Sequence, residues 1–169
     1  GPLLGTDTAI FVADADPSTT TNPNDADSDD DGLTDGTEDA DADGSQSIIE
    51  TNPNDADTDA DGVQDGTESG ISTGHPTDTD NGVFIADADP STTTDPLESD
   101  TDNDGLTDGE EDINGDGQVE PSTTIGGTGT AGSGETDPNN NDSDSDTLLD
   151  GDEVNIHFTS ALDSDTDDG

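Results

Sequence analysis

The sequence predicts a tandem repeat that is mostly irregular, with little regular secondary structure and a few short β-strands. Bound ions, rather than an apolar core, are expected to hold it together. Three observations predict this fold class. The 169 residues include 47 Asp and Glu but no Lys or Arg, which gives a formal net charge of -47. Leu, Ile, Val and Phe make up about 14 % of the chain, below the roughly 20 % of chains that fold by burying apolar surface. An acidic twelve-residue motif also recurs.

An internal repeat organises the chain. FVADADPSTTTNP at 11–23 returns as FIADADPSTTTDP at 84–96, a shift of 73, and 23 of the 34 residues of 6–39 match at that shift. A glycine-rich insert lengthens the second unit, so that Asp57 corresponds to Asp142 at a shift of 85. The expected organisation is unit 1 at 1–73, unit 2 at 74–160 with the insert at 125–134, and the start of a further unit at 161–169.

Four copies of the acidic motif place oxygen-bearing groups at positions 1, 3, 5, 7, 9 and 12. This spacing is that of a calcium loop, in which position 7 contributes its backbone carbonyl and position 12 a bidentate carboxylate. Two carboxylates about 4 Å apart repel by roughly 4 kcal/mol in a partly screened protein setting, so closure of such a loop requires a cation. The candidate ligands are Asp27, Asp29, Asp31, Leu33, Asp35 and Glu38; Asp57, Asp59, Asp61, Val63, Asp65 and Glu68; Asp100, Asp102, Asp104, Leu106, Asp108 and Glu111; and Asp142, Asp144, Asp146, Leu148, Asp150 and Glu153.

Position 6, where the loop turns sharply, is glycine in the first three copies and Thr147 in the fourth, which is therefore expected to be the weakest site. Two further loops follow directly on a first one. In the second of these, position 12 is Thr123, a poor ligand, and Glu120 is expected to compensate. Their candidate ligands are Asp39, Asp41, Asp43, Ser45 and Glu50, and Asp112, Asn114, Asp116, Gln118 and Glu120. Three looser acidic pairs lie outside these loops, and the sequence leaves open whether they contribute ligands to neighbouring ions. They are Asp14 and Asp16, Asp78 and Asp80, and Asp87 and Asp89.

The ligand set favours calcium. Six to eight carboxylate and carbonyl oxygens in a flexible loop suit calcium, whereas magnesium requires a tight octahedron and retains its waters. The alternative is a disordered acidic spacer, but random acidity would not keep glycine at position 6 together with glutamate at position 12. The chain has no cysteine, which excludes disulfides and thiolate-bound zinc or iron.

The segments between the loops are of two kinds. Hydroxyl-rich stretches such as ADPSTTTNP are expected to be extended linkers, with O-glycosylation of their Thr and Ser residues as the alternative. Short apolar stretches at 9–12, 82–86 and 154–158 are the strand candidates. These strands would pair within the chain or with a neighbouring subunit.

An EF-hand is not expected, because proline, glycine and threonine flank the loops where amphipathic helices would be needed. NDADSDDDGLTDGTED, NDADTDADGVQDGTES and SDTDNDGLTDGEED instead resemble the thrombospondin type 3 repeat in its cysteine-free bacterial form. The resemblance covers roughly 24–68, 97–120 and 137–169. It implies a chain with little secondary structure that wraps around a row of calcium ions serving as its core.

The remaining features narrow the function. The chain contains no stretch of 18 apolar residues, so no membrane span is expected. Nucleic acid is not expected as a partner, because both molecules would be polyanions. His75 and His157 lack the neighbours of a catalytic set, so an enzyme is not expected. Uniform tandem units favour an extracellular, calcium-stiffened stalk, spacer or filament of a microbial cell surface, with calcium ions and copies of the chain itself as partners. The alternative is an adhesive or calcium-buffering region of a secreted protein.

Overall fold

The computed structural model describes residues 12–120 and 134–165 and contains only short helices there. These are α1 (Asp35–Glu38), α2 (Asp65–Glu68), α3 (Asp108–Glu111) and α4 (Asp150–Asp152), which continues into a π-helix, η1 (Glu153–His157). The other described residues form turns, bends and irregular segments, and no strand occurs among them. The expectation of little regular secondary structure is confirmed.

Each α-helix begins at position 9 of one of the four acidic loops. The preceding residue is extended, as at Thr34 with ψ of 148°, and the chain then makes a single helical turn. Acidic side chains occupy the first turn, where they interact favourably with the amide groups of a helix start. At α3, Thr107 and Glu110 also form a reciprocal capping box. The helical turn carries the position 12 glutamate to the inner side of its loop.

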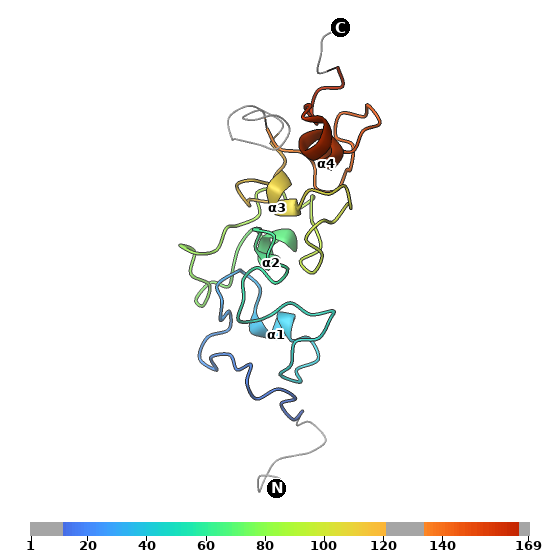
Figure 1. The fold of residues 1–169 in the computed structure, drawn as a ribbon. Coiled ribbons are helices and arrows are strands. Elements are labelled where there is room, and N and C mark those ends of the chain that lie inside the picture. The colour runs from blue at the N-terminus through green and yellow to red at the C-terminus, as the bar shows by residue number, and fades with distance from the viewer. Residues whose placement is uncertain (1–11, 121–133, 166–169) are drawn as a thin grey trace, which may run out of the picture.

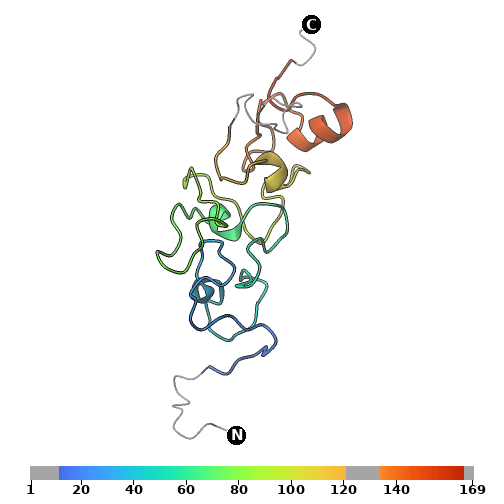
Figure 2. The ribbon, with the colours of Figure 1, turned by 90° about the vertical axis from the view of Figure 1, so that its left-hand side faces the viewer.

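The four helices follow one another in chain order along the long axis of an elongated molecule (Figure 1). The perpendicular view shows the same progression from the N-terminal to the C-terminal end (Figure 2). The acidic loops are therefore stacked in a column, each on the previous one. None of the helices within 12–120 and 134–165 has the length or the apolarity that crossing a bilayer requires.

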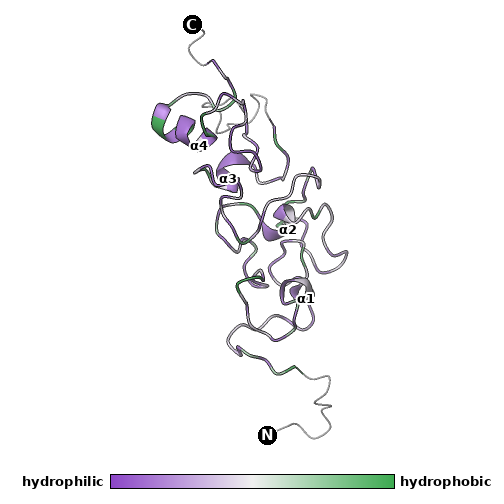
Figure 3. Ribbon diagram, turned by 90° about the vertical axis from the view of Figure 1, so that its right-hand side faces the viewer, coloured by the Kyte–Doolittle hydropathy of each residue, from purple (hydrophilic) through white to green (hydrophobic). Residues whose placement is uncertain are grey.

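The interior of the column is acidic rather than apolar. Among the described residues the buried apolar side chains are Leu33, Val63, Phe84, Leu106 and Ala161. The hydropathy colouring shows only scattered apolar segments along a mostly polar chain (Figure 3). Side chains of Asp and Glu are more numerous in the interior, and they include Asp27, Asp31, Glu38, Asp65, Glu68, Asp104, Asp108, Glu111, Glu135, Asp150 and Glu153.

The expected strands are not formed in the described part of the chain. Residues 82–86 are irregular, because Phe84 packs on Gly32 of the first loop while no second strand lies beside them to pair with. Residues 154–158 instead extend α4 as η1 and end at Phe158, whose φ is 58°. The candidate at 9–12 lies outside the described residues apart from Val12, which is irregular.

The hydroxyl-rich connectors belong to the fold. The Thr19 hydroxyl donates to the Gly44 carbonyl at 2.9 Å, and the equivalent Thr92 hydroxyl donates to the Gly117 carbonyl at 2.7 Å. Each connector therefore packs against the loop that follows an acidic helix, the Asp39 loop in the first unit and the Asp112 loop in the second. The repeat seen in the sequence is thus accompanied by the same connector contact in both units.

Candidate metal centres

Backbone amides hold the side chains of each loop in place. In the second loop, Asp57 Oδ1 accepts the Asp61 amide at 3.2 Å and Oδ2 accepts the Gly62 amide at 3.1 Å. The position 1 aspartates at Asp39, Asp100, Asp112 and Asp142 accept the amides of positions 5 and 6 in the same way. As a result, carboxylate oxygens from positions 1, 3 and 5 lie within 4.8 Å of one another in the loops beginning at Asp27, Asp39 and Asp57.

Position 6 requires a left-handed backbone. Gly32, Gly62 and Gly105 have φ of 96°, 113° and 99°, and Thr147 in the fourth loop has φ of 89°. Glycine reaches this conformation without a steric penalty, whereas a β-branched residue is strained in it. The expectation that position 6 of the fourth loop is unfavourable for threonine agrees with its backbone conformation.

Both oxygens of Glu111 are buried without a hydrogen-bond partner, whereas the position 12 glutamates Glu38, Glu68 and Glu153 are each half satisfied. One carboxylate oxygen accepts a threonine hydroxyl from a later segment, and the other oxygen is buried with no hydrogen-bond partner. These pairs are Glu38 with Thr51 at 3.2 Å, Glu68 with Thr94 at 3.0 Å and Glu153 with Thr159 at 3.0 Å. A buried carboxylate oxygen without a donor is costly, and a cation at that oxygen would remove the cost.

A second kind of cluster lies between successive loops. Oxygens of Asp31 and Glu38 from the first loop lie within 4.8 Å of an oxygen of Asp65 from the second, and all three residues are buried. The cluster recurs at the next junction as Asp61, Glu68 and Asp108. Spacing within one loop could not reveal it, because two of its ligands come from one motif and the third from the next.

A close backbone approach brings these junctions together. The amide of the glycine at position 10 donates to the position 5 carboxylate of the preceding loop, and a Cβ on that glycine would collide with the position 5 carbonyl oxygen. The pairs are Gly66 with Asp31 at 3.1 Å, Gly109 with Asp61 at 3.0 Å and Gly151 with Asp104 at 2.9 Å. Only glycine permits this close approach of two loops. The glycine of the D-G-x-E sequence, at position 10, is therefore needed for one loop to stack on the preceding one.

The interior of the column concentrates carboxyl groups whose pKa values are raised. Burial, reinforced by the neighbouring aspartates, raises the pKa of Glu38, Glu68 and Glu111 to about 9. Burial also raises the pKa of Asp31 and of Asp102 to about 7. If nothing else compensated their charge, the three glutamates would hold protons at neutral pH and the two aspartates would be partly protonated. Since the chain has no Lys or Arg, the compensating charge must come from solution.

The Asp112 loop obtains a carboxylate that the sequence analysis missed. Glu135 is fully buried; one of its oxygens accepts the Glu120 amide at 3.1 Å and the other has no partner. Burial, with Asp112 as the strongest neighbouring charge, raises the pKa of Glu135 to about 7. The shift of 85 that relates Asp57 to Asp142 also relates Glu50, at position 12 of the Asp39 loop, to Glu135. The signal was present, but the glycine-rich insert separates Glu135 from its loop; Thr123, the residue expected at this position, lies outside the described residues.

The looser acidic pairs differ in their surroundings. Asp87 is buried beside Gly117, and one of its oxygens has no partner. The equivalent Asp14 lies beside Gly44 but is exposed. Asp78 is paired with His75 at 3.0 Å. Only Asp87 of these thus resembles the buried ligands of the loops.

The donor set of these centres fits a hard cation, because carboxylate and carbonyl oxygens supply it throughout. The sequence predicted the grouping of positions 1, 3 and 5, and the junction clusters and Glu135 add to it. No protein-family model, curated protein or solved structure matches this chain.

Proposed function

We propose that this chain is an extracellular structural repeat that bound calcium stiffens, forming a stalk, spacer or filament of a microbial cell surface. The observation that carries the proposal is the junction cluster of Asp31, Glu38 and Asp65, three buried carboxylates from two loops of a protein without Lys or Arg. A calcium ion there would bind one loop to the next. Repeated along the column, such ions would fix its length and its rigidity.

The resemblance to the thrombospondin type 3 repeat supports calcium as the ion, since it implies loops that wrap around a row of calcium ions. The location follows from affinity. Extracellular calcium modules work at free calcium of about 10⁻⁴–10⁻³ M, a range in which many adjacent acidic loops can be filled together. We therefore place the chain outside the cell and assign it no catalytic role.

Small-angle scattering with calorimetry tests this function. In millimolar calcium the chain should scatter as a stiff rod, and in chelator it should expand to a flexible coil, because binding energy is then also folding energy. Magnesium at the same concentration is the matched control and should not restore the rod. Identical scattering in calcium and in chelator would contradict a stiffening role, and calcium uptake without any change of shape would favour the buffering alternative.

A further inference from the structure

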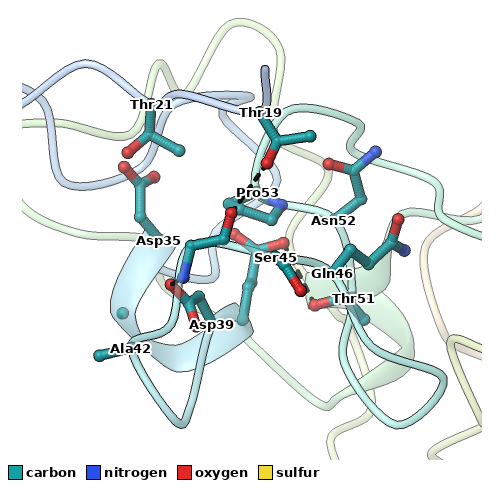
Figure 4. A pocket seen from close by; sticks show the side chains of 13 residues that line it. Thr19, Thr21, Asp35, Asp39, Ala42, Ser45, Gln46, Thr51, Asn52 and Pro53 are labelled. Atoms are coloured by element: carbon teal, nitrogen blue, oxygen red, sulfur yellow. Dashed lines mark hydrogen bonds between the residues drawn. The ribbon is translucent and has the colours of Figure 1, made fainter. Parts of the chain in front are cut away.

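Two cavities occupy equivalent places in the two units but differ in size. The first, of about 220 Å³, is lined by Thr19, Asp35, Asp39 and Gly44 among others. Figure 4 shows the side chains of Thr19, Asp35 and Asp39 in its wall. A shift of 73 converts these four residues into Thr92, Asp108, Asp112 and Gly117, which line a cavity of only about 20 Å³. The same site is therefore open in unit 1 and nearly filled in unit 2.

The preceding loop fills the second cavity. Val63, Thr67 and Glu68 of the second loop line it together with the residues of unit 2. The Thr94 hydroxyl donates to Glu68 across this junction at 3.0 Å. Thr21, the counterpart of Thr94, lines the open cavity, and no such loop precedes it in the described part of the chain.

Gly36 marks the same difference. A Cβ on Gly66, Gly109 or Gly151 would meet the carbonyl oxygen of the loop below, whereas a Cβ on Gly36 would have no heavy atom within 4 Å. Gly36 is also exposed. The first loop thus presents a complete stacking surface that nothing covers in the described residues.

The opposite end of the column presents the complementary surface. Asp146, at the position of Asp31 and Asp61, is half-buried, and no glycine amide from a further loop reaches it within the described residues. Leu148 is half-buried where Val63 is buried. The shift of 85 places Leu148 and Glu153 where Val63 and Glu68 stand in the filled junction.

We propose that a second copy of this chain docks here head to tail, its fourth loop inserting Leu148 and Glu153 into the open cavity beside Gly36. The internal junction between the second and third loops is the template for this contact. Because the two surfaces differ and each copy carries both, the contact is heterologous and does not close on itself, so it generates an open filament. The inference rests on the proposed function, since the docking loop must first be ordered by calcium.

Docking exchanges one threonine for another. In the single chain the Thr159 hydroxyl donates to Glu153, and Thr21 of the incoming copy would take over that role, as Thr94 does for Glu68. The segment after Thr159 must then move aside, which exposes the buried Ser160 and Ala161 as well as shifting the already exposed residues 163–165. Removal of the Thr159 hydroxyl should therefore favour association.

Gly36→Ala tests the interface with little effect on the single chain. The new methyl group enters open space there, and alanine favours a helical turn more than glycine does. In the assembly it would collide with the Asp146 carbonyl. In saturating calcium we expect wild-type protein to form filaments in electron micrographs, and Gly36→Ala to raise the concentration needed for association at least tenfold. Ser72→Ala, at an exposed mid-chain position, is the matched control and should behave like wild type.

Thr21→Val and Thr159→Val extend the test, the first weakening association and the second strengthening it. Calcium binding of every variant is measured by calorimetry, so that failure to bind calcium would contradict the proposed function rather than the interface. Calcium-saturated wild type that stays monomeric at all concentrations would overturn the proposal. So would filaments that tolerate Gly36→Ala. A monomer destabilised by Gly36→Ala would also overturn it, because the cavity would then be occupied by the chain's own residues.

Discussion

At the scale of single residues, backbone amides and threonine hydroxyls hold the carboxylates of the loops in position, but no side chain of Lys or Arg neutralises their charge. Amides of the same loop hold the position 1 aspartate, and a threonine hydroxyl holds one oxygen of each of Glu38, Glu68 and Glu153. These contacts satisfy part of each carboxylate and leave one oxygen of each glutamate directed into a buried space without a donor. A single cation could serve several such oxygens at once.

Glu111→Gln should affect more than one site, because Glu111 is buried in the third loop and directly precedes the Asp112 loop. Loss of its charge should weaken calcium binding there by on the order of tenfold or more, given the energy of close charge pairs. Hydrogen exchange resolved by residue, at stepped calcium, should show lost protection in both the Asp100 and the Asp112 loops. Glu153→Gln is the matched control and should lose protection locally; equal losses confined to one loop in both variants would show independent sites.

Thr147→Gly should strengthen the weakest loop. The φ of 89° at Thr147 costs a β-branched residue about 1–3 kcal/mol, and glycine removes this strain. Calcium should then leave the fourth loop at a lower free concentration than in wild type, as measured by NMR titration of its amides. Gly105→Thr is the reciprocal control and should weaken the third loop; unchanged titration in both variants would show that position 6 does not limit affinity.

At the scale of elements, the unit of structure is a loop together with the single helical turn that closes it. The turns are too short to be stable alone. The preceding loop helps to order α2, α3 and α4, because its position 5 carboxylate accepts the amide of the glycine in the turn. A carboxylate that serves both its own loop and a junction couples the two. Order should therefore spread along the column from neighbour to neighbour.

Gly109→Ala should uncouple the two units. Its Cβ would meet the Asp61 carbonyl oxygen, and overpacking of this kind costs typically 1–3 kcal/mol. We expect the two halves of the chain to unfold separately as calcium is lowered, as seen in a biphasic circular dichroism titration. Gly36→Ala, in open space, should retain the wild-type profile at concentrations below association. A single transition in Gly109→Ala would contradict the role assigned to the junction.

The sequence was sufficient to predict that the carboxylates of positions 1, 3 and 5 come together in the Asp27, Asp39 and Asp57 loops, because one motif of twelve residues contains that geometry. It missed Glu135 of the Asp112 loop, which the glycine-rich insert separates from that loop. It was insufficient for contacts between motifs, such as Asp65 with Asp31, since these depend on how loops stack. The strands expected at 82–86 and 154–158 were wrong because alternating apolar residues need a neighbouring strand. Phe84 found a loop glycine instead, and residues 154–157 continued a helical turn.

At the scale of the whole molecule, the charge of -47 makes compactness conditional. Burial raises the pKa of Glu38, Glu68 and Glu111 from 4.5 to about 9, so the compact, ion-free chain binds more protons than the unfolded chain. Its stability is therefore present below about pH 4.5 and is lost as the pH rises towards 9. Under the proposed function, protons and calcium would compete for the same oxygens.

Scattering in chelator should show this dependence directly. We expect the radius of gyration to be smaller at pH 4 than at pH 8 without calcium, because protonation removes the repulsion between buried carboxylates. With saturating calcium the chain should remain compact at pH 8. A larger radius at pH 4 than at pH 8 in chelator would contradict the direction of these pKa shifts.

The column of loops has a consequence for how such a protein can change over generations. Stacking contacts join each of the second, third and fourth loops to the one before it, which is the arrangement that lets one-dimensional repeat proteins gain or lose whole units. A globular domain that doubled its residues would need a new interior, whereas under the proposed function this chain would need only more calcium. Its reach can therefore be selected independently of its chemistry, with the ion content of the surroundings as the only outside requirement.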